Sequence, residues 1–187
     1  MGCGLSSRGP MSPLYTNDFT PPCHELAPLS VQFPENFPPS GLVTNENGTF
    51  FDDREFIKQC QIVHIQEITL YFEKYLTGIE IHYYLDGGIK EVKNCSNLPS
   101  KRYVFPMQNN DSVVACEASH EDGKIMSIKF ETFEGRILDV VGSGGHGKQK
   151  TQVNLKPQRR AVVAFKGKLN AYIEGLRVYS WKLCSKR

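Results

Sequence analysis

The 187-residue sequence has little of what marks several common functional classes. None of its six cysteines lies in a C-x-x-C pair, so the ligand spacing typical of zinc sites is missing and we predict no metal site. No run of about 18 apolar residues is present, so no membrane-spanning helix is predicted. The formal net charge is only +2, whereas general nucleic-acid binders usually carry a clear basic excess, so we predict no nucleic-acid partner.

The sequence also lacks a pattern of catalytic residues. Its five histidines are scattered singly, and no local motif supports a nucleophilic pair such as Cys60 with His82. Residues 142–148 have the G-x-x-x-x-G-K spacing of a phosphate-binding loop, but Gln149 stands where such a loop needs Ser or Thr. A strand is expected after this loop instead of a helix. We therefore predict a glycine-containing hairpin loop here, no catalytic residue, no cofactor and no enzymatic activity.

The first eight residues match a lipidation pattern. Removal of Met1 would expose Gly2, and Ser6 stands at the hydroxyl position preferred for myristoylation. Cys3 is placed for a palmitoyl chain, and two chains together would anchor the protein stably. Residues 1–8 are thus either an acylation segment or a chance match. Residues 1–30 lack the apolar core of a secretory signal, which predicts a cytoplasmic protein, membrane-anchored or within a cytoskeletal or organellar assembly if Gly2 is acylated.

A proline-rich stretch covers residues 9–44. Proline removes backbone donors and fixes φ, which disfavours helices and sheet interiors. Apolar and aromatic side chains such as Phe19, Phe33 and Phe37 are interleaved with the prolines, unlike in a purely solvated linker. We predict an extended arm that lies on its own domain or on a protein partner.

From about Asn45 the sequence changes character, and short strand-like runs alternate with glycine turns. The clearest run is 79–86, in which Ile79, Ile81 and Tyr83 alternate with polar residues, the period of a half-buried strand. Further strands are expected at 61–75, 89–92, 113–118, 125–131, 136–141, 151–155, 161–165 and 176–181. Many short strands at this spacing predict an all-β barrel, sandwich or prism.

The order of these segments resembles the jacalin-related lectin family over about residues 45–183. The similarity is carried by residues 47–53 before the expected first strand, Ile68 with 78–83, 125–130, 135–136, 142–145, and the closing segments 165–167 and 176–179. This resemblance implies a β-prism I fold, in which three four-stranded antiparallel sheets surround a pseudo-threefold axis. The proline-rich arm lies outside it, and residues 184–187 form a basic tail.

The resemblance also implies a ligand site. In this family, backbone amides and one aspartate of a G-x-x-x-D loop hold a sugar, and an N-terminal glycine-rich turn completes the site. The matching positions here are Asn170, Ala171, Tyr172 and Glu174 in the loop, with Asn47 and Gly48 in the turn. Asn170 replaces the glycine, and because asparagine tolerates the left-handed conformation, the turn is expected to survive. Glu174 replaces the aspartate and displaces the carboxylate by about 1 Å, a shift large enough to disturb a preset pocket.

These substitutions lead to two alternative functions. The first is a non-enzymatic β-prism interaction module that docks to another protein in a larger assembly, with the arm supplying extended contacts. The second is a working carbohydrate-binding lectin, in which residues 170–174 contact sugar hydroxyls. Our main prediction is the docking module, with a membrane as an additional partner if Gly2 and Cys3 are acylated.

Overall fold

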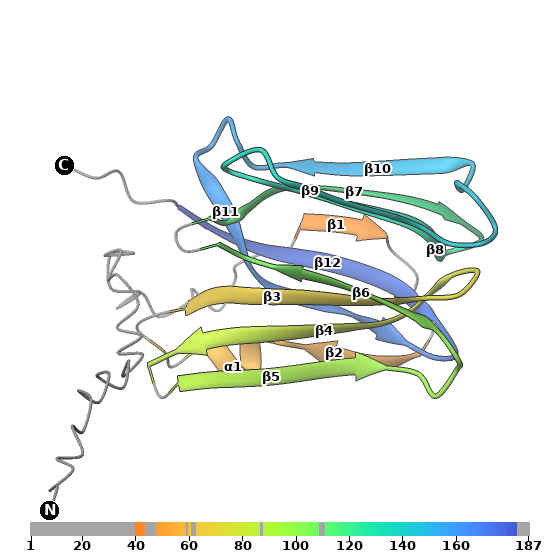
Figure 1. The fold of residues 1–187 in the computed structure, drawn as a ribbon, viewed down its shortest axis with the longest axis horizontal. Coiled ribbons are helices and arrows are strands. Elements are labelled where there is room, and N and C mark those ends of the chain that lie inside the picture. Colours follow the sequence, from red (N-terminus) through yellow and green to blue (C-terminus); the bar gives the residue numbers. More distant parts are fainter. Residues whose placement is uncertain are drawn as a thin grey trace, which may run out of the picture.

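A computed structural model of the protein describes residues 40–43, 48–58, 60, 63–86, 88–108 and 111–182. These residues form three four-stranded sheets in which every strand pair is antiparallel (Figure 1). The β-prism predicted from the sequence is therefore confirmed. Within the described part of the chain, no helix is long and apolar enough to cross a membrane.

The first sheet joins the two ends of the domain. Its order is β1-β12-β11-β2, built from β1 (Ser40–Val43), β12 (Ile173–Lys182), β11 (Arg160–Leu169) and β2 (Thr49–Asp52). The sheet begins at Ser40, so strand structure starts before the expected boundary at Asn45. The segment expected to precede the first strand contains β2 itself, which pairs with β11. A short helix, α1 (Arg54–Ile57), lies between β2 and the next strand.

The other two sheets come from the middle of the chain. The second sheet has the order β10-β7-β8-β9, with β10 (Gln149–Asn154), β7 (Val113–Glu121), β8 (Lys124–Thr132) and β9 (Ile137–Val141). The third has the order β5-β4-β3-β6, with β5 (Gly88–Cys95), β4 (Leu76–Leu85), β3 (Val63–Phe72) and β6 (Lys101–Pro106). The sequence analysis missed β6, an edge strand whose side chains are mostly exposed and which ends at a proline.

The alternation of apolar and polar residues places the core between the sheets. On β4, Ile79, Ile81 and Tyr83 are fully buried, as the period-2 pattern predicts. Phe130 on β8 and Phe165 on β11 are also fully buried, and their rings meet edge to face with centroids 5.9 Å apart. This aromatic pair connects the second sheet to the first across the prism interior.

Turns from all three sheets gather at one end of the prism (Figure 1). They are the β3–β4, β7–β8, β9–β10 and β11–β12 turns, and Gly48 immediately before β2 joins them. Loops held by a rigid frame are where binding residues most often lie. This end of the prism therefore contains the candidate site.

Candidate functional site

The β11–β12 hairpin forms a tight turn at residues 170–172. The Asn170 N–H donates to the Tyr172 carbonyl at 3.0 Å, and Leu169 pairs directly with Ile173. Lys168 pairs with Gly175, so Glu174 is an extra residue on β12 and forms a bulge. The expected loop of residues 170–174 is therefore shorter, because strand pairing continues to Leu169 and resumes at Ile173.

The turn forms although Asn170 stands where the family has glycine, but Asn170 does not adopt the left-handed conformation that the sequence suggested. Among the described residues, the non-glycine residues with positive φ are Asp122 and Arg159. Asn170 therefore closes the turn without adopting the left-handed conformation. Asn170 and Ala171 are exposed, Tyr172 is half-buried, and Glu174 is buried.

Gly48 packs directly on this hairpin. A Cβ atom at Gly48 would lie 2.8 Å from the Leu169 carbonyl oxygen and 3.2 Å from the Asn170 nitrogen, and its φ is +101°. Only glycine combines this backbone conformation with such a close approach. The structure thus brings Gly48 and residues 169–172 together, whereas Asn47 lies outside the described residues.

Two tyrosines and a lysine lie next to the hairpin. The Tyr75 and Tyr172 rings meet edge to face with centroids 4.9 Å apart, and the Lys124 Nζ lies 5.3 Å and 5.5 Å from the two centroids. Tyr75 belongs to the β3–β4 turn, Lys124 begins β8, and Tyr172 precedes β12. Each residue therefore comes from a different sheet. Sequence reasoning did not identify Tyr75 or Lys124, because no local spacing links positions so far apart.

The chemistry of this end suits a polyhydroxylated ligand. Tyrosine offers an apolar ring face together with a hydroxyl group at its tip. The side-chain amide of the exposed Asn170 supplies further hydrogen-bonding groups. Carboxylate oxygens accept hydrogen bonds from hydroxyl groups, and Glu174 places such a group at the bulge.

The glycine-containing loop between β9 and β10 supports the β3–β4 turn. The Ser143 N–H donates to the Glu73 carbonyl at 2.9 Å, and a Cβ atom at Gly142 would lie 2.3 Å from the Lys74 carbonyl oxygen. Strand β10 follows the loop, so it lacks the helix that a phosphate-binding loop requires. The predicted glycine-containing loop is present, but the predicted hairpin is wrong: β9 pairs with β8 and β10 pairs with β7, so the loop connects opposite edges of the second sheet. The loop fixes the turn that carries Tyr75.

Substituting Gly142 with alanine should loosen this support. We expect Gly142→Ala to lower the free energy of unfolding by about 1–3 kcal/mol, because the new methyl group meets backbone that must move. Gly144→Ala is the matched control, since its Cβ would meet mainly the flexible ends of Met126 and Lys74. Urea unfolding of both variants checks this prediction. If both variants lost the same free energy of unfolding, the close approach at Gly142 would not be what destabilises Gly142→Ala.

Comparison with known families gives the chain its assignment. A profile of the Jacalin-like lectin domain matches residues 40–179, which is most of the sequence. The chain belongs to the jacalin-like lectin domain family. This confirms the resemblance read from the sequence, and the matched range begins at Ser40, the first residue of β1. Comparison with curated protein sequences finds no significant match.

Solved structures share the fold of this jacalin-like domain at low sequence identity. A mannose-binding lectin from Champedak has a TM-score of 0.61 and 18% identity, covering 76% of this chain and 94% of its own. An artocarpin–mannopentose complex has a TM-score of 0.64 and 17% identity, covering 78% and 97%. Wild-type Malaysian banana lectin has a TM-score of 0.64 and 13% identity, covering 76% and 96%. These similarities establish the fold.

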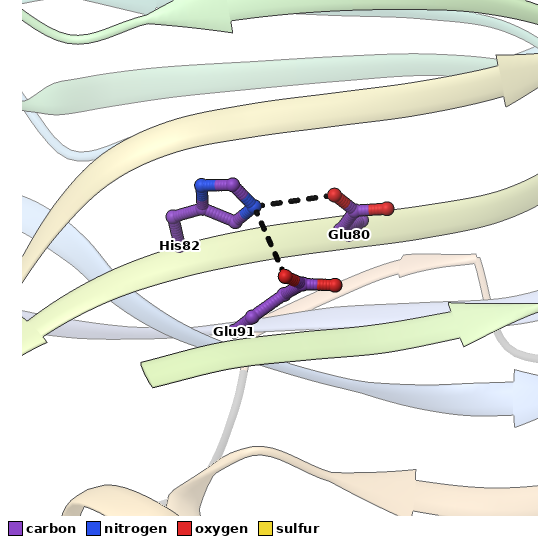
Figure 2. A group of neighbouring side chains, drawn as sticks. All are labelled: Glu80, His82 and Glu91. Atoms are coloured by element: carbon purple, nitrogen blue, oxygen red, sulfur yellow. Dashed lines mark hydrogen bonds and ion pairs between the residues drawn. The ribbon is translucent and has the colours of Figure 1, made fainter. Parts of the chain in front are cut away.

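The jacalin-like domain has a second polar cluster, on the outer face of the β5-β4-β3-β6 sheet. Glu80 and His82 project from β4, and Glu91 projects from β5 (Figure 2). The His82 Nε2 lies 3.2 Å from a Glu80 oxygen and 3.9 Å from a Glu91 oxygen. Glu80 and His82 are among the polar residues that alternate with Ile79, Ile81 and Tyr83 in the strand predicted at 79–86. The sequence analysis did not predict that Glu91 joins them, because strand register is needed for that inference.

Proposed function

We propose that this domain is a non-enzymatic carbohydrate-binding module whose site is the turn end around residues 170–174. The observation that carries the proposal is the close approach of Gly48 to Leu169 and Asn170. It joins the two segments that the family resemblance implies for sugar binding. This favours the lectin alternative over the docking module as the primary function.

Mannose-type saccharides are the ligand class we propose. The structural neighbours of the chain include a mannose-binding lectin and an artocarpin–mannopentose complex, which supports this choice. Sugar hydroxyl groups would form hydrogen bonds with the side-chain amide of Asn170 and the hydroxyl of Tyr172, and would donate hydrogen bonds to the Glu174 carboxylate. The rings of Tyr172 and Tyr75 would contact the apolar face of the sugar. Tyr75 and Lys124 would then set which saccharides fit beside the turn.

Titration with methyl α-mannoside, followed by NMR or calorimetry, tests the proposal. We expect Gly48→Ala to weaken binding at least about tenfold, since a misplacement of about 1 Å suffices to spoil a preset site. Gly135→Ala is the control: Gly135 also has positive φ, +83°, but a Cβ there meets nothing within 4 Å. It lies in the β8–β9 turn at the opposite end of the prism (Figure 1). Absence of binding by the unmodified protein at millimolar methyl α-mannoside and methyl α-galactoside would overturn the proposal.

The docking role remains a prediction. It rests on the proline-rich arm, and residues 1–39 lie outside the described residues. Acylation of Gly2 and Cys3 also remains a prediction, because both residues lie outside the described part of the chain. The membrane contact and the cellular location inferred from acylation remain predictions with it. The basic tail at 184–187 likewise lies outside the described residues.

A further inference from the structure

Sheet geometry places three potential metal ligands at one point on the outer face of β4 and β5. His82 and Glu91 are direct cross-strand partners, and Glu80 lies two residues before His82, so all three side chains project from the same face. Their ligand atoms all lie within 4.8 Å of one another (Figure 2). One imidazole and two carboxylates form a donor set that transition metals such as zinc accept.

The distances are close to those that a metal requires. Two ligand atoms about 2 Å from a tetrahedral zinc ion lie about 3.3 Å apart. The His82 Nε2 and the Glu80 Oε1 are already separated by 3.2 Å. The Glu91 Oε2 lies 3.9 Å from the same nitrogen, and the Glu91 side chain is 58% exposed. A small rotation of this exposed side chain would complete the geometry.

Neighbouring side chains orient these ligands. Glu67 on β3 is the cross-strand partner of His82 on its other side, and its Oε1 lies 3.9 Å from the His82 Nδ1. A carboxylate next to Nδ1 favours the imidazole tautomer whose Nε2 is free to bind a metal. The Tyr71 hydroxyl donates to the Glu80 Oε2 at 2.6 Å and leaves the Oε1 facing His82.

The local charge also favours a bound cation. The carboxylates of Glu67, Glu80 and Glu91 surround His82, while the compensating cations are Lys93 and Arg102.

We propose that this cluster binds one divalent transition-metal ion of the zinc type. Its ligands are the Glu80 Oε1, the His82 Nε2 and the Glu91 Oε2, with water at the fourth position. The metal would bond to both His82 and Glu80 in place of their direct contact. Its bond to Glu91 would hold the edge strand β5 to β4. Zinc would thus stabilise one sheet of the domain, away from the turns at the sugar site.

Titration of the untagged full chain with Zn²⁺, followed by calorimetry, tests this inference, and Co²⁺ absorption reports the coordination. We expect one site, with affinity lowered at least about tenfold by His82→Asn and by Glu91→Gln, and about tenfold by Glu67→Gln. Glu91→Gln is the safest variant for folding because its side chain is exposed. Lys93→Met should raise the affinity severalfold, because it removes a cation 3.2 Å from the Glu80 Oε2.

His120→Asn is the control for general histidine effects, because the His120 Nε2 contacts the Thr151 hydroxyl on another sheet. It should leave zinc affinity unchanged, and Glu91→Gln should leave methyl α-mannoside binding unchanged. The inference would be overturned if the protein bound no zinc, or if Glu91→Gln bound zinc as tightly as the unmodified chain. The latter result would assign the zinc to other groups, such as the cysteines.

Discussion

Replacing Asp53 with asparagine is expected to stabilise the domain at neutral pH by up to about 3 kcal/mol. Asp53 is buried at the N-terminus of α1, where the Tyr83 hydroxyl donates to its Oδ2 at 2.7 Å and the Asn94 amide donates to its Oδ1 at 3.3 Å. Burial raises the pKa of this carboxyl from 3.8 to about 6, against the opposing effect of these hydrogen bonds. An asparagine side chain still accepts a hydrogen bond from the tyrosine hydroxyl, but it carries no charge that must be desolvated.

The direction of the pH dependence follows from this raised pKa. The folded protein holds the Asp53 proton more tightly than the unfolded chain does, so the stability linked to protonation is complete below the unfolded pKa of 3.8. It is lost as the pH rises through the folded pKa of about 6. A rise of this size in the pKa of Asp53, from 3.8 to about 6, corresponds to about 3 kcal/mol. Most paired carboxylates show the opposite trend.

Urea unfolding between about pH 4 and pH 7 measures this effect. The part of the pH dependence that comes from Asp53 should disappear in Asp53→Asn. The stability of this variant should exceed that of the unmodified protein most clearly at neutral pH. Asp52→Asn is the matched control, because the Asp52 carboxylate accepts from the Tyr179 hydroxyl at 2.9 Å and pairs with Arg54 and Lys166. That change should destabilise by about 1–3 kcal/mol. A loss of stability in Asp53→Asn at neutral pH would contradict our account of the buried carboxylate.

These two aspartates show what the sequence can and cannot predict. Asp52 is the last residue of β2 and contacts Tyr179 on β12, whereas Asp53 adopts the α-helical conformation at the start of α1 and contacts Tyr83 on β4. The Asp52 Oδ1 accepts a hydrogen bond from the Arg54 N–H at 3.1 Å, whereas Asp53 makes no side-chain cap. The partner Tyr83 is distant in sequence, so local patterns do not reveal that Asp53 is buried.

The same limit applies to the candidate site. Period-2 alternation and glycine turns predicted most strands, because each strand must bury one face regardless of its partners. The family resemblance located Gly48 and residues 170–174. In contrast, Tyr75, Lys124 and Tyr172 meet only because turns from three sheets converge at one end of the prism. Such a convergence depends on sheet packing, which the local sequence does not encode.

The aromatic contact between the first and second sheets should be a major source of stability. Phe130 is fully buried on β8, and its ring packs edge to face on Phe165 of β11. Truncating a buried phenylalanine removes its burial energy and leaves a cavity, because surrounding strands relax only partly. We expect Phe130→Ala to lower the free energy of unfolding by about 3–5 kcal/mol.

The chain provides its own control for this prediction. Phe133 lies just beyond β8 with 68% of its surface exposed, so Phe133→Ala makes the same chemical change where little apolar area is buried. That substitution should change stability by no more than about 0.5 kcal/mol. Thermal and urea unfolding of both variants should therefore differ strongly although the positions are close in sequence. Similar losses in the two variants would mean that Phe130 does not occupy the prism interior, and the packing of the first sheet against the second would have to be revised.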